Sequence, residues 1–73
     1  MLSFYFSPIE GILISSTGYY REPDLKQPQL TLLPKRAGTK MRILGAHLQG
    51  SWLKVIDSEG LIGYIPLTAI RII

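Results

Sequence analysis

Side chains suited to acid–base or metal chemistry are few in this chain of 73 residues. His47 is the single histidine and there is no cysteine, so no histidine pair, thiolate metal site or disulfide framework can be built. Asp57 and Glu59 are neighbouring carboxylates, but they fall in a DSEG segment typical of a hairpin turn, where acids accept local hydrogen bonds. No glycine-rich phosphate loop precedes a predicted helix. We therefore predict that the protein is not an enzyme, needs no cofactor or metal, and acts on no small-molecule substrate.

Basic side chains gather in the middle of the chain. The net charge is +3, and no Asp or Glu occurs between Leu25 and Ile56. This asymmetry is typical either of a surface for phosphate groups or an acidic protein, or of a solvated edge whose lysines deter sheet-to-sheet pairing. If nucleic acid is the partner, the predicted contacts are Lys35, Arg36, Lys40, Arg42 and Lys54.

Length and composition predict one small globular domain that covers residues 1–73. Hydrophobic residues make up 47% of the chain, well above the disordered class. No stretch approaches the roughly 20 apolar residues of a membrane span, and residues 1–8 lack the basic start of a signal peptide. We expect a cytoplasmic protein without membrane association. The apolar segment 1–10 is either an extra strand or an interface arm.

Short strands separated by turn signals are predicted along the chain. Residues 11–17 are rich in β-branched side chains, and 39–44 and 52–56 alternate between apolar and polar side chains. A return strand over 61–65 ends at Pro66, residues 67–69 are short enough for one 3₁₀ turn, and a last strand covers 70–73. Residues 22–28 hold two prolines and are predicted to be an irregular loop. The predicted core consists of Met41, Ile43, Leu53, Val55, Ile65 and Ile70, with Leu33 and Ile14 as additions.

The order of these motifs resembles the bacterial Src-homology-3 (SH3b) family. The resemblance rests on 38–44 (GTKMRIL), 50–55 (GSWLKV), Gly60 and 63–66 (GYIP) followed by Ile70. Residues 20–23 (YREP) are loosely similar to the family's opening motif, but they lack its asparagine and one residue of spacing. The resemblance covers roughly residues 18–73 and implies an all-β, five- to six-stranded SH3-like barrel with a short 3₁₀ turn before the last strand. A barrel also removes the open edges that so short a chain has little means to cover.

The resemblance also implies a ligand-binding groove. Relatives of this fold hold extended peptides between aromatic side chains and a proline, and the matching positions are Trp52 and Pro66. Strand alternation places Trp52 opposite Leu53, outside the core and partly exposed, with Tyr64, Tyr20 and Tyr19 as flanking residues. The structural alternative is that Trp52 covers one end of the barrel.

Three functions compete. The leading hypothesis is a protein-interaction module, or a small self-associating subunit of a larger bacterial or phage assembly, because the apolar termini exceed what so small a core requires. The alternative is a nucleic-acid-binding barrel that uses Trp52 and the basic residues. A lesser alternative is peptidoglycan binding, which the bacterial family performs in cell-wall enzymes.

Overall fold

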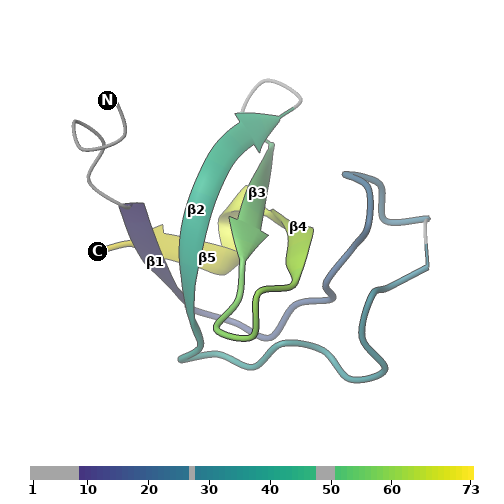
Figure 1. Ribbon diagram of the computed structural model, residues 1–73, viewed down its shortest axis with the longest axis horizontal. Coiled ribbons are helices and arrows are strands. Elements are labelled where there is room, and N and C mark those ends of the chain that lie inside the picture. The colour runs from purple at the N-terminus through teal and green to yellow at the C-terminus, as the bar shows by residue number, and fades with distance from the viewer. Residues whose placement is uncertain (1–8, 27, 48–50) are drawn as a thin grey trace.

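The computed structural model describes residues 9–26, 28–47 and 51–73 (Figure 1). Within these residues one antiparallel sheet contains five strands in the order β4-β3-β2-β1-β5, and a 3₁₀ turn, η2, precedes the last strand. No α-helix occurs in the described ranges, so the all-β prediction is confirmed. No helix in this part of the chain is long and apolar enough to cross a bilayer. The elements are β1 (Ile9–Leu13), β2 (Lys40–His47), β3 (Trp52–Ile56), β4 (Ile62–Pro66), η2 (Leu67–Ala69) and β5 (Ile70–Ile72).

The β3–β4 hairpin forms where alternation and turn chemistry agree. Leu53 and Val55 are buried while Lys54 between them is exposed, as the period of two predicts. Gly60 closes the turn with a φ of 86°, a conformation that favours glycine, and its N–H donates to the Asp57 carbonyl at 3.1 Å. Pro66 is the last residue of β4, because proline cannot continue the ladder. The predicted bounds of β3 and of the 3₁₀ turn are confirmed.

All six residues of the main predicted core lie in or against the hydrophobic cluster, with Val55 and Ile65 fully buried. The two additions are wrong. Ile14 is 54% exposed, because Leu13 faces the core and the next residue along the chain points away from it. Leu33 is 74% exposed in an irregular segment, where Leu30 packs against the core instead.

The sheet is open in the described residues, since its edge strands β4 and β5 are not paired with each other. β2 shifts register between Ile43 and Gly45, and such an irregularity bends a strand. Of the segment 1–10, Ile9 and Glu10 belong to β1, which pairs with both β2 and β5. The remainder of that prediction lies outside the described residues.

The loop over 14–39 projects beyond β4 on the right of Figure 1 and returns to β2. Its two limbs are joined by backbone bridges, Thr17 with Lys35 and Tyr20 with Gln29. Tyr20 also exchanges two backbone hydrogen bonds with Tyr64 of β4, at 3.0 and 2.7 Å. The loop therefore covers part of the edge that β4 would otherwise present.

Candidate functional site

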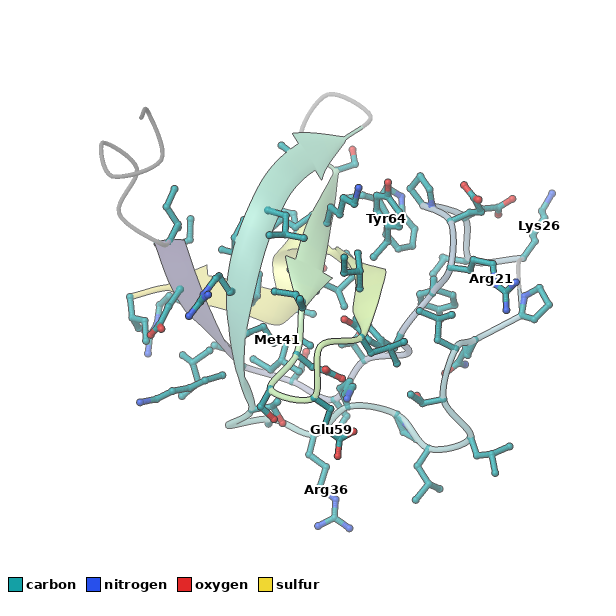
Figure 2. All side chains as sticks on the ribbon, in the orientation of Figure 1. Arg21, Lys26, Arg36, Met41, Glu59 and Tyr64 are labelled. Atoms are coloured by element: carbon teal, nitrogen blue, oxygen red, sulfur yellow. The ribbon has the colours of Figure 1, made fainter. Side chains whose placement is uncertain are left out.

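Four predicted ligand-binding residues, which we call the aromatic strip, come together from three segments: Tyr20, Trp52, Tyr64 and Pro66. Trp52 starts β3 directly opposite Pro66 of β4, and Tyr64 is paired with Tyr20 through the backbone. The Tyr20 and Trp52 rings meet edge to face, with centroids 5.6 Å apart and planes at 87°. In Figure 2 the Tyr64 side chain stands on β4 at the side that faces the long loop. The fold thus places residues 20, 52, 64 and 66 in one surface region.

Trp52 is more covered than predicted. It lies outside the core cluster, as strand alternation indicates, but only 9% of the residue is exposed, where partial exposure was predicted. Tyr20 stands against its ring and Pro66 lies opposite on β4. Such an aromatic pair adds about 0.5–1.5 kcal/mol beyond the area that it buries. Trp52 therefore forms the floor of the aromatic strip, and the half-buried Tyr20, Tyr64 and Pro66 form its accessible part.

Tyr19 does not flank Trp52, contrary to the prediction. It is fully buried in the core, because Tyr19 and Tyr20 point to opposite sides of an extended segment. Its hydroxyl donates a hydrogen bond to the carbonyl oxygen of Leu61 at 2.5 Å. The carbonyl oxygen of Val55 lies 3.3 Å from the same hydroxyl and is a second acceptor. Burial, and secondly the charge of Asp57, raise the pKa of this hydroxyl above its usual range, so it stays protonated.

A Cβ atom at position 63 would lie 2.8 Å from both the Tyr19 ring and a Leu30 methyl group. Glycine is therefore required at this position, because the Tyr19 ring packs directly on the strand.

Lys35 binds Asp57 across the fold. The Lys35 Nζ atom lies 2.8 Å from Asp57 Oδ2 and 5.0 Å from the centre of the Tyr19 ring. Asp57 Oδ1 accepts hydrogen bonds from the backbone N–H groups of Glu59 and Leu61, each at 2.9 Å. The predicted role of Asp57 in the turn is confirmed, whereas its ion pair with Lys35 was not foreseen.

The pKa of Asp57 reflects two opposing causes. Burial by itself raises it, but the hydrogen bond from Lys35 and those from Leu61 and Glu59 outweigh burial and hold the pKa below its usual 3.8. Asp57 is therefore ionised at neutral pH, and Lys35 is engaged by it.

The remaining predicted basic residues separate into two groups. Arg36 lies in the turn before β2, and its guanidinium points away from the sheet at the bottom of Figure 2. Lys40 and Arg42 of β2 and Lys54 of β3 are exposed on the outer face of the sheet, opposite the core. Among the described residues these three cations form no ion pair. Because β2 and β3 are interior strands, the cations do not protect an open edge.

An open cleft of about 360 Å³ lies between β1, β2 and the 57–60 turn, beside Lys40 and Arg42. Its lining also includes Ile56, Asp57 and Glu10 of β1, and Glu10 stands directly opposite Arg42. The cleft falls within the size range of ligand pockets in proteins. Ile56 connects the cleft to the aromatic strip, because it pairs with Ile62, which lies two residues before Tyr64 on β4.

Within the described residues, no three His, Cys, Asp or Glu side chains gather in the manner of a metal site. Comparison with protein-family models, with curated proteins and with solved structures gave no significant match. The geometry of this chain is therefore the basis for assigning its function.

Proposed function

We propose that the protein is a non-enzymatic binding module whose aromatic strip receives an extended segment of a protein partner. One observation carries this proposal: the fold brings Tyr20, Trp52 and Tyr64 together from separate segments and leaves the two tyrosines half-buried at the surface. Partly exposed aromatic side chains on a firm floor are enriched at binding hot spots.

We also propose that the fold is an SH3-like barrel of the bacterial kind. The order of elements supports this: a long loop between the first two strands, a tight β3–β4 hairpin and a 3₁₀ turn before β5. Pairing of β1 with both β2 and β5, and of Tyr20 with β4, carries the sheet part of the way round the core.

Nucleic-acid binding is the second candidate, because Lys40, Arg42 and Lys54 share an outer face without described acidic partners. Two findings favour a protein partner over it. Trp52 is too covered to offer its ring for base stacking, and Lys35 is engaged by Asp57.

A random peptide display library selected on the immobilised protein tests the proposal. Selected peptides should bind the wild-type chain and lose most of their affinity for Tyr64→Ala, because truncating a hot-spot aromatic costs roughly 2 kcal/mol or more. Tyr64→Phe keeps the ring and serves as the matched variant. Leu32→Ala serves as a remote control, because Leu32 is fully exposed on the long loop.

Each variant needs a thermal melt beside the binding assay. Equal affinity of wild type and a folded Tyr64→Ala for every selected peptide would show that the strip is not the binding surface.

A further inference from the structure

We infer that the partner segment is acidic, and that an Asp or Glu side chain of it enters the cleft beside Lys40 and Arg42. This inference rests on the proposed function, since it extends the same binding surface from the aromatic strip to β2. It assigns the partner a chemical class: an extended peptide with an apolar residue at one end and a carboxylate at the other.

The charges of the cleft support an anionic ligand group. Lys40 and Arg42 alternate with the buried Met41, so both side chains leave the same face of β2. Neither forms an ion pair with a described residue, and Asp57 at the cleft wall already binds Lys35. A carboxylate between the two cations would form charge-assisted hydrogen bonds, with the fork of Arg42 suited to bidentate contact.

The register of the strands sets the spacing of the ligand. Arg42 pairs with Ile56, Ile56 pairs with Ile62, and Tyr64 follows two residues later on β4. Two strand spacings of about 4.8 Å and two residues of about 3.3 Å separate Arg42 from Tyr64 by roughly 12 Å. An extended peptide covers this distance in about three to five residues. Ile56 and Ile62 provide apolar contact between the two ends.

The same residues favour a peptide over a nucleic acid. Glu10 stands beside Arg42 and would repel the continuous charge of a phosphate backbone, whereas a single carboxylate can approach from the Lys40 side. Lys54 is a further exposed cation on this face, and it stands directly opposite Tyr64 of β4. A single acidic group followed by apolar residues suits this distribution.

Two measurements test the inference separately from the proposed function. In the display selection, Asp or Glu should be enriched three to five residues from the apolar anchor. Peptides selected on the double variant Lys40→Ala, Arg42→Ala should keep the apolar anchor residue and should no longer be enriched in Asp or Glu. Each selected peptide should bind that variant about three- to tenfold more weakly than the wild type. Glu10→Gln, which removes the opposing charge, should strengthen the same peptides.

The second measurement is a titration of the nitrogen-15-labelled protein with acetyl-Glu-Ala-Ala-amide, which carries a single carboxylate, with acetyl-Gln-Ala-Ala-amide as control. The backbone signals of Arg42, Ile56 and Ser58 should shift in the wild type and in Tyr64→Ala alike. The shifts should weaken with added salt, since the contacts are exposed.

The outcomes are distinguishable. Tyr64-dependent peptides without acid enrichment would overturn the inference and leave the proposed function standing. Failure to obtain peptides whose binding depends on Tyr64 would overturn the proposed function. Absence of glutamate-specific shifts would show that the cleft does not bind a carboxylate, and would overturn the inference. If a thymidine oligonucleotide moved the same signals at lower concentration than the single-glutamate peptide, the assignment to an acidic peptide would be wrong.

Discussion

The Lys35 ammonium and the Asp57 carboxylate join two parts of the chain that have no strand in common. Lys35 lies on the returning limb of the long loop, paired through its backbone with Thr17, and Asp57 opens the β3–β4 turn. The side chain of Asp57 is 3% exposed and that of Lys35 is 19% exposed. The pair therefore attaches the loop to the hairpin in a largely dry environment.

Lys35→Met should destabilise the protein by about 1–3 kcal/mol, because it leaves a buried carboxylate without its cation. Lys26→Met, at an exposed position of the same loop, should have almost no effect. Urea unfolding of the wild type, of Lys35→Met, of Asp57→Asn and of the double variant gives the coupling energy by a double-mutant cycle. A coupling near zero would mean that the observed ion pair contributes no stability.

Stability should fall in acid partly through Asp57. Its pKa in the folded state lies below the usual 3.8, so the unfolded chain binds its proton first as the pH decreases. The contribution of ionised Asp57 to the free energy of unfolding is complete above pH 3.8 and is lost as the pH falls through the lower, folded-state pKa. The free-energy difference between wild type and Asp57→Asn should shrink correspondingly from pH 7 to pH 2 in urea titrations. A difference that stayed constant over this range would contradict the ionised pair.

Trp52→Ala should cost about 3 kcal/mol of folding free energy, because most of the ring is covered. Tyr20→Ala should leave the fold intact and expose that ring. The chain has one tryptophan, so the emission maximum of the folded Tyr20→Ala variant should move to longer wavelength. An unchanged spectrum would show that Tyr20 does not shield Trp52 in solution.

Val55→Asp should abolish folding, since Val55 is fully buried and an unpaired charge there has no partner. Lys54→Asp, one residue earlier on the exposed side of β3, should still unfold cooperatively. Circular dichroism melts of both variants check the strand register, which is wrong if the two behave alike.

Gly63→Ala should destabilise the protein by about 1–3 kcal/mol, because the new methyl group overlaps the Tyr19 ring. Gly45→Ala is the matched change, also within the sheet, and its Cβ would meet no atom within 4 Å. Denaturant midpoints should separate the two variants clearly. Equal midpoints would indicate that Tyr19 moves aside at little cost.

Local patterns were sufficient to predict the second half of the fold. In β3 the alternation of Leu53, Lys54 and Val55 agrees with the turn chemistry of Gly60 on one side. Pro66 marks the end of β4 and the start of the 3₁₀ turn, so the two boundaries reinforce each other. A segment is predictable when strand alternation, turn residues and proline positions all indicate the same structure.

Contacts made by the long loop were not predictable in the same way. Tyr19 follows Gly18 and precedes another tyrosine, so no alternation indicates which ring enters the core. The cover that Tyr20 provides for Trp52, and the ion pair of Lys35 with Asp57, join residues far apart in sequence. The structure brings Tyr20, Trp52, Tyr64 and Pro66 into one surface region, whereas Tyr19 enters the core. The exposure of Trp52 depended on a loop conformation that single-residue patterns do not specify.

The close packing of Tyr19 on Gly63 has a consequence for how this sequence can diverge. Positions 19, 30 and 63 share one fixed volume, so a larger side chain at one of them requires a smaller one at another. Substitutions at these positions should therefore be inherited as compensated sets, and Ala at position 63 should occur with a residue smaller than tyrosine at position 19. Lineages that keep the tyrosine have little freedom at position 63.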